Sequence, residues 1–195
     1  MTTTRIAELV SAATRLPFMA VPLFALVGAV SADIPGIFWA LLCAFLTSGL
    51  SLIYLFFLTR SGKVRDPRRI PQSERVGPLR VVAGLHAGAF VVATLLDAPA
   101  ALRAVLLAYA VATALFALLA PAVNLSLHAA GVSGTAVCLL FVFGTWGLPA
   151  LVLVPLVWWA RMVLGRHTPF ELALGVLVGG GGTWLAFQLV GRWPG

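Results

Sequence analysis

The sequence predicts an all-α protein, a polytopic bundle of transmembrane helices in which residues 1–195 form a single integral-membrane domain. Hydrophobic residues make up 61% of the chain, charged residues make up 10%, and the mean hydropathy is +1.04. A soluble domain of this length carries more charge, whereas a bilayer core about 30 Å thick needs repeated apolar segments of about 20 residues. The composition therefore excludes a soluble enzyme or a soluble binding module.

The apolar segments predict six or seven spans with no soluble domain between them. Before the first span, Thr4–Ala13 mixes apolar side chains with Arg5 and Glu8, which predicts a short amphipathic helix on the membrane surface. Several segments are short, so we expect the first two or the last to be tilted, re-entrant or shifted by a few residues. In order, the predicted spans are Leu16–Ser31, Pro35–Leu58, Leu79–Asp97, Ala101–Leu119, Ala129–Trp146, Pro149–Leu164 and Pro169–Val190.

Positive charge gathers on one predicted side of the membrane. The amino terminus and the loops 60–80, 120–128 and 161–168 share that side, which holds all 13 Lys and Arg residues except Arg103 and Arg192. A net charge of +7 would suggest nucleic acid in a soluble protein, but beside a bilayer it suits membrane lipids and a lipid phosphate substrate. The positive-inside rule makes this side the cytoplasmic face of a bacterial cytoplasmic membrane; a phosphate site would collect the same cations on either face.

Two of these loops have an ordinary structural explanation and a functional one. The basic stretch Thr59–Arg80, which is interrupted by prolines, could simply fix the topology.

The stretch Asn124–Gly134 opens a span, and either Asn124 or Ser126 can cap that helix. Its free N–H groups and the positive end of its dipole would then bind an anion, with His128 in the first turn. A lone histidine there would be an interfacial residue without a catalytic role.

The third loop contains the clearest pattern. Gly165 can end the sixth span, and Thr168-Pro169-Phe170-Glu171 is typical of a helix start with a capping box, which by itself explains Glu171. The same turn would project His167 from the membrane boundary with Glu171 behind it, one carboxylate oxygen capping the helix and the other orienting the imidazole. Arg161 lies about one turn inside the span, where an unpaired charge costs several kcal/mol.

Other unusual residues predict packing. His86 lies in an apolar span and is expected to hydrogen bond between helices. Gly175 and the run 179–182 would allow the last helix to approach a neighbour closely. Cys43 and Cys138 lie inside apolar segments, where a thiol behaves as a small hydrophobe, so we expect neither a disulfide nor a metal site.

Together these loops resemble the signatures of the type 2 phosphatidic acid phosphatase (PAP2) superfamily. Leu125-Ser126-Leu127-His128 is similar to its Pro-Ser-Gly-His, and Arg161, His167 and Glu171 are similar to its Arg/His/Asp pattern. The first signature, a Lys followed by Arg-Pro, matches poorly: Lys63 is present, but Ile70 precedes Pro71. Arg75 or the pair Arg68-Arg69 would supply the second cation. The resemblance covers about residues 60–185, a PAP2-like core, and leaves residues 1–58 as additional amino-terminal helices.

The resemblance implies hydrolysis of a phosphate monoester or diphosphate without a metal or other cofactor. His167, held by Glu171, would attack phosphorus and form a phosphohistidine. His128 would protonate the leaving group and then assist water. Charge on the phosphoryl oxygens would be stabilised by Lys63, Arg75, Ser126, the backbone at Leu127, and Arg161.

The location implies a substrate with an apolar tail, and polyprenyl phosphate or diphosphate, phosphatidic acid and phosphatidylglycerol phosphate all qualify. The alternative is a non-enzymatic protein that binds or transports lipid phosphates on a PAP2-like scaffold, although a transporter should show broken or polar helices near the midplane. A prenyltransferase is disfavoured, because the chain has only three Asp residues, far apart, at positions 33, 66 and 97. The sequence leaves the oligomeric state open.

Overall fold

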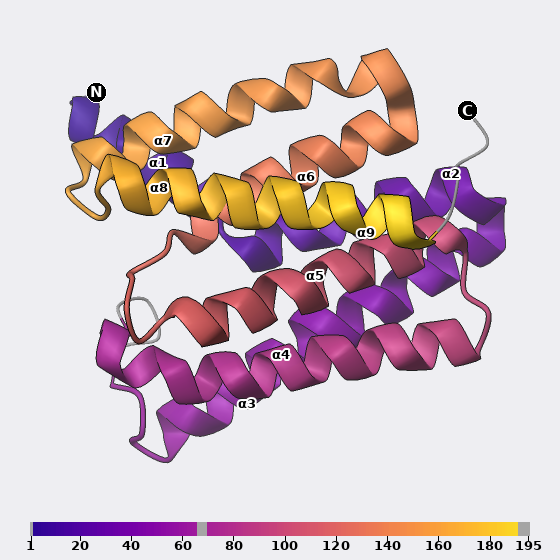
Figure 1. Cartoon of the computed structure of the whole chain (residues 1–195), viewed down its shortest axis with the longest axis horizontal. Helices are drawn as coiled ribbons and strands as arrows, with labels where there is room; N and C mark the ends of the chain where they lie inside the picture. The colour runs from indigo at the N-terminus through magenta and orange to yellow at the C-terminus, as the bar shows by residue number, and fades with distance from the viewer. Residues whose placement is uncertain (1, 66–69, 191–195) are drawn as a thin grey trace.

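The computed structural model describes residues 2–65 and 70–190, and all regular structure in these ranges is helical (Figure 1). The helices run roughly side by side and form an elongated bundle. Three irregular helical segments, η1 to η3, continue or join the α-helices. The bounds are α1 Thr3–Ala13, α2 Leu16–Ala44, η1 Phe45–Gly49, α3 Leu50–Arg60, α4 Gln72–Leu95, α5 Ala100–Leu119, α6 Leu127–Phe143, η2 Gly144–Val152, α7 Leu153–Val163, α8 Pro169–Val176, η3 Leu177–Gly181 and α9 Gly182–Val190.

The chain reverses direction twice within segments that are helical throughout. Within α2, a Cβ added at Gly28 or Gly36 would collide with the carbonyl oxygen of the other glycine. In a straight helix these two glycines, eight residues apart, would be separated by about 12 Å. Between α6 and α7, Gly144 has a φ of +58° and Gly147 packs on the backbone of Leu139. Figure 1 shows both turns at the same end of the bundle. The predicted spans on either side of each turn are therefore the arms of two helical hairpins.

Five helical stretches within the described residues are long and apolar enough to cross a membrane, or six if α1 and the first part of α2, bent by 48°, are counted as one broken span. This is close to the six or seven predicted spans. The counts differ partly because the stretch Leu127–Val163 reverses at η2 and contains two of the predicted segments. The five stretches are Ile34–Arg60, Glu74–Leu95, Ala100–Leu119, Leu127–Val163 and Pro169–Val190.

Many of the buried residues of the bundle are small, and many large apolar residues lie on its outer surface. The central helix α5, which packs on α2, α4 and α9, buries Ala101, Ala104 and Ala108 together with Leu102 and Leu106. Small side chains let helix backbones approach closely, which is how helices associate in lipid. Large hydrophobic side chains are exposed along the outer surface, including Phe18, Phe38, Phe56, Leu95, Leu118, Trp146 and Leu177. This arrangement is suited to a lipid environment.

The predicted packing roles of Gly175, Gly179 and His86 are confirmed, whereas nothing lies within 4 Å of a Cβ added at Gly181. Gly175 faces the carbonyl oxygen of Ser126, and Gly179 faces the backbone of Ala130, so α8 and η3 lie directly against α6. The ring of His86 contacts hydroxyls on two helices, with Nε2 3.4 Å from Ser51 Oγ and Nδ1 3.3 Å from Thr113 Oγ1. The thiols of the two cysteines are free and buried in the apolar core.

The polar connections meet at one end of the bundle, as predicted. The start of α4 reaches the connection between α5 and α6, where Gln72 Nε2 donates a hydrogen bond of 2.9 Å to the Ala120 carbonyl. The turn between α7 and α8 lies against the same connection, and α1 packs on α7. Figure 1 shows the amino terminus and these turns together at the end opposite the two hairpin reversals.

The contact between η3 and α6 gives a test of this packing. We expect Gly179→Ala to lower the melting temperature of the detergent-solubilised protein, because its Cβ would overlap the Ala130 backbone at a cost of about 1–3 kcal/mol. Gly181→Ala is the matched control: nothing lies within 4 Å of its Cβ, and alanine favours the helix. Equal melting temperatures for the two variants would contradict the close approach of these helices.

Candidate active site

His167 lies in a short turn that is defined at both ends. Helix α7 stops in a Schellman arrangement, in which Gly165 N–H donates to the Met162 carbonyl, Arg166 N–H donates to the Arg161 carbonyl, and Gly165 has a φ of +58°. Helix α8 begins immediately afterwards with Thr168 as its N-cap and Pro169 in its first turn. The imidazole is thus carried by a connection of five residues between two helices, and its side chain is only 5% exposed.

The predicted capping box is confirmed. Thr168 N–H donates to Glu171 Oε2 at 2.9 Å, and Glu171 N–H donates to Thr168 Oγ1 at 3.3 Å. The same Oε2 lies 3.3 Å from His167 Nδ1. The carboxylate therefore both caps the helix and contacts the imidazole, but it does so with one oxygen, where the sequence predicted a division between the two.

The surroundings of His167 indicate which ring nitrogen carries the proton. Nδ1 has three near neighbours: the Asn124 carbonyl at 3.1 Å, Glu171 Oε2 at 3.3 Å and the Asn124 amide nitrogen at 3.5 Å. The two nearer ones are oxygens that can only accept. A nitrogen that faces two acceptors is the donor in a neutral imidazole, so Nδ1 is protonated and Nε2 carries the lone pair. This is the tautomer that a nucleophilic histidine requires.

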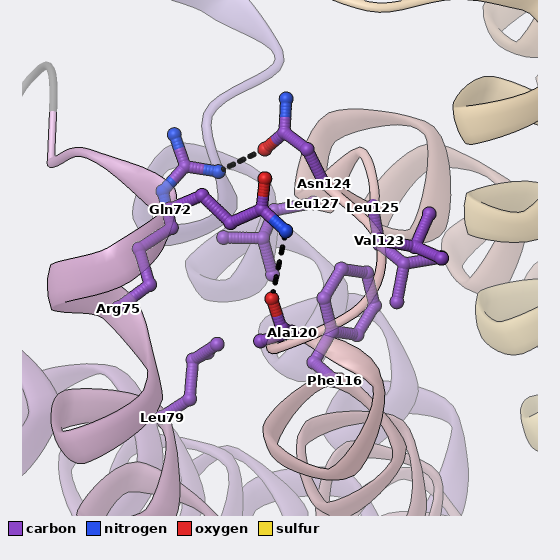
Figure 2. Close-up of a pocket in the computed structure, with 9 residues that line it drawn as sticks. All are labelled: Gln72, Arg75, Leu79, Phe116, Ala120, Val123, Asn124, Leu125 and Leu127. Carbon is purple, nitrogen blue, oxygen red and sulfur yellow. Dashed lines mark hydrogen bonds between the residues drawn. The ribbon is translucent and has the colours of Figure 1, made fainter.

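Arg75 is brought to this group through Asn124. Its guanidinium donates from Nε to the Ile70 carbonyl at 2.6 Å and from Nη1 to Asn124 Oδ1 at 2.7 Å. Figure 2 shows the second of these bonds spanning from α4 to the connection between α5 and α6, above a small pocket with mostly apolar walls. The lining residues are Gln72, Arg75, Leu79, Phe116, Ala120, Val123, Asn124, Leu125 and Leu127.

The other predicted cation of the first signature is not brought to the group. Lys63 is exposed in the loop after α3, and within the described residues it makes no hydrogen bond or ion pair. The alternative pair Arg68-Arg69 lies outside the described residues. Of the candidates named from the sequence, Arg75 is the one that the structure ties to His167.

Arg161 and His128 meet at a residue that the sequence did not single out. Arg161 Nη1 donates to Ser11 Oγ at 2.8 Å, and His128 Nε2 lies 3.1 Å from the Ser11 carbonyl, so this nitrogen carries the donated proton. Arg161 Nε is buried and has no hydrogen-bond partner among the described residues. Helix α1 therefore covers these two side chains as well as being amphipathic. The buried residues of α1 are Ala7 and Ser11, which lie four positions apart on one helical face. These two small residues are the sequence feature that indicates which face of α1 packs against the bundle.

Ser126 and Leu127 form the start of α6. Ser126 is the N-cap, as one of the two sequence alternatives predicted, and its Oγ accepts from Ala129 N–H at 3.3 Å. It is fully buried, so its hydroxyl serves the helix in this arrangement. Leu127 is the first helical residue and is half-buried. Their predicted contacts with phosphate remain predictions.

The charge around His167 is predominantly positive. Arg161 lies within electrostatic range of Arg15, Arg75 and Arg166, and Glu171 is the acid that acts on both Arg75 and His167. Burial lowers the pKa of His167 below its ordinary 6.5, and Arg161 lowers it further, while the charge and hydrogen bond of Glu171 and the Asn124 carbonyl oppose this shift. A partly buried group of cations with one carboxylate is suited to an anion.

Two further observations bear on what the group could bind. No cluster of three or more His, Cys, Asp or Glu side chains that could hold a metal ion occurs in the described part of the chain. Comparisons of the sequence and structure with protein-family models, curated proteins and solved structures give no match.

The electrostatics of the group can be tested through His167. We expect Glu171→Gln to lower the His167 pKa, because it removes the charge that raises it while a glutamine can still form the capping box. Arg161→Gln should raise that pKa by removing a repelling cation. NMR titration of the histidine ring signals in detergent measures both, with His167→Asn identifying the resonance. Shifts in the same direction would contradict the arrangement.

The contact of α1 can be tested by proteolysis. Ser11→Ala removes a hydrogen bond to a charged group, which is worth about 1.5–3 kcal/mol. We therefore expect local opening of α1, and cleavage by trypsin after Arg5, to increase roughly 10- to 150-fold. Thr4→Ala is the control, because Thr4 is an exposed hydroxyl residue of the same helix. Equal cleavage rates in the two variants would show that Ser11 does not hold α1 in place.

Proposed function

We propose that the protein is a membrane-embedded lipid phosphatase that hydrolyses a phosphate monoester or diphosphate through a phosphohistidine intermediate. The observation that carries this proposal is the environment of His167: Nδ1–H is held by two oxygens, which leaves the Nε2 lone pair for attack beside a group of arginines. The resemblance to PAP2 signatures supports the same assignment from the sequence. The proposed enzyme uses no metal.

In the first step, His167 Nε2 forms a bond to phosphorus and the bond from phosphorus to the leaving oxygen breaks. His128 begins this step as an imidazolium and becomes neutral when it gives a proton to that oxygen, while Arg75 and Arg161 stabilise the charge on the phosphoryl oxygens. In the second step, water attacks phosphorus and gives a proton to His128, the P–N bond breaks, and phosphate leaves. His167 is then neutral again, with its proton on Nδ1.

Ser11 must move during this cycle. Its carbonyl accepts the Nε2–H of His128, and its hydroxyl occupies one N–H of Arg161. The first hydrogen bond must open before His128 Nε2 can transfer its proton to the substrate. The second must open before Arg161 can donate that N–H to the phosphate. The substrate oxygens would take the place of the Ser11 oxygens.

The position of the group favours a lipid substrate. The cations lie at the end of a bundle whose outer surface is apolar, so a phosphate that reaches them from a leaflet keeps its chain in the membrane. The pocket beside Arg75 has apolar walls formed by Leu79, Phe116 and Val123. Polyprenyl phosphates and glycerophospholipid phosphates both fit this description. We place the site at the cytoplasmic face of a bacterial cytoplasmic membrane, on the charge distribution alone.

The second candidate is a non-enzymatic protein that binds or transports lipid phosphates. One observation favours it: the donor of His128 is occupied by Ser11, and the His167 side chain is 5% exposed, so the two histidines are covered in this arrangement. Binding would require the arginines but neither histidine as a catalyst.

Phosphate release separates the two candidates. With EDTA present, we expect the purified protein to release phosphate from a prenyl diphosphate or from phosphatidic acid. His167→Ala should lower the rate at least about 10³-fold, because it removes the nucleophile, and His128→Ala should lower it roughly 10²–10⁴-fold, because it removes the general acid. The control is His86→Asn, which changes a histidine that contacts Ser51 and Thr113 instead.

The outcomes distinguish the proposals. Wild-type protein that binds these lipids but releases no phosphate would favour the binding candidate. Release that persists in His167→Ala would exclude His167 as the nucleophile, and release that stops with EDTA would contradict a metal-independent reaction.

A further inference from the structure

Asn124 joins two parts of the candidate site that come from different helices. It lies in the connection between α5 and α6, after the loop that Gln72 contacts and before the N-cap of α6. Its side-chain Oδ1 accepts from Arg75 of α4, and its main-chain carbonyl accepts from His167 in the turn between α7 and α8. One residue thus contacts both the cation and the histidine.

The orientation of the amide follows from its partner. A guanidinium has only donors, so the atom of Asn124 that faces Arg75 at 2.7 Å must be the oxygen. The amide nitrogen then points the other way and lies 3.5 Å from His167 Nδ1, a long contact between two donor nitrogens. Figure 2 shows the oxygen facing the guanidinium and the nitrogen turned away from Gln72 and the pocket. The amide nitrogen donates to no oxygen within the described residues, so its N–H groups can donate to an anion that reaches Arg75.

The same bond determines how Arg75 is presented. Two of its five N–H groups are used, one by the Ile70 carbonyl and one by Asn124, and these bonds fix the plane of the guanidinium. Within the described residues, three N–H groups remain for an anion. A long flexible side chain that is already ordered loses less entropy when it binds a phosphate.

We propose that Asn124 is a positioning residue of the site, which orients Arg75 through its side chain and His167 through its carbonyl so that both face the same phosphoryl group. This inference rests on the proposed function. Neither of the signatures that the chain resembles includes a residue at this position, and the sequence suggested Asn124 only as an alternative helix cap. The cap is Ser126, which leaves the Asn124 side chain free for Arg75.

A purely structural role is the competing explanation, and the chain contains a matched control for it. Gln72 also ties α4 to the connection between α5 and α6, by donating to the Ala120 carbonyl at 2.9 Å, and it lines the same pocket. It contacts neither Arg75 nor His167 through any hydrogen bond within the described residues. If these hydrogen bonds only hold the loop, removing either one should have the same effect.

The test is a double-mutant cycle on Arg75 and Asn124, measured as kcat and KM for phosphate release and as the Kd for inorganic phosphate. We expect Asn124→Ala and Arg75→Ala each to lower kcat/KM about tenfold, and the double variant to be within about twofold of Arg75→Ala, because the two residues act through one another. The effect of Gln72→Ala on kcat/KM should instead multiply with that of Arg75→Ala, because no hydrogen bond joins these two side chains within the described residues. If Asn124→Ala does not fold, Asn124→Ser repeats the cycle with a side chain too short to reach the guanidinium.

The two proposals fail in different ways. Independent, multiplying effects of Arg75→Ala and Asn124→Ala, or an Asn124→Ala variant that behaves like Gln72→Ala, would overturn the positioning role while wild-type hydrolysis stands. If wild type neither releases nor binds phosphate, the proposed function fails and the role of Asn124 fails with it. If wild type binds phosphate without hydrolysing it, the cycle measured as Kd still decides whether Asn124 positions Arg75.

Discussion

The arrangement of the polar end depends on one carboxylate oxygen, Oε2 of Glu171. It accepts the N–H of Thr168, which starts α8, and it lies within hydrogen-bond distance of His167 Nδ1. The N–H groups at the start of a helix have no preceding turn to accept them, and the capping box satisfies two of them here. Because the same oxygen serves both purposes, the position of His167 is coupled to the start of a helix.

A second constraint is the need to satisfy charge in an apolar bundle. Arg161 lies in the last turn of α7, and its Nη1 donates to Ser11 while its Nε has no partner in the part of the chain that the structure describes. An incompletely satisfied, partly buried guanidinium near three other arginines is unfavourable unless an anion joins the group. Helix α1 therefore supplies a hydrogen-bond acceptor to Arg161, as a bound phosphate would. The free-energy cost of holding the arginines close together is explained if they bind an anionic ligand.

The rest of the bundle holds this end together by close packing. Helices α6 and α8 carry Ser126 and Glu171, and they approach closely because Gly175 has no side chain between them. A main-chain hydrogen bond also joins the starts of the two helices, since Ser126 N–H donates to the Glu171 carbonyl at 3.4 Å. The glycines that pack the last helix are thus part of the reason that His167 lies beside the connection between α5 and α6.

The sequence by itself determined the features that depend on neighbouring residues. Hydropathy over about 20 residues predicted the helical class and the apolar segments, and local hydrogen bonding predicted the stop at Gly165 and the capping box of Glu171. Loop polarity also predicted which end of the bundle would hold the charged groups. The sequence did not predict the helical segment η2 between the fifth and sixth predicted spans, because its conformation depends on how Gly147 packs against α6.

Only the tertiary structure decided which polar groups meet. Ser11 and Arg161 are 150 positions apart, and Arg75 and Asn124 are 49 apart, so no local periodicity or cap relates them. The sequence proposed Lys63 as the first cation of the first signature and Arg75 as the second, and of these two the structure ties only Arg75 to His167. The physical reason is that a side chain finds its partner through the packing of whole helices, which a pattern over a few residues does not contain.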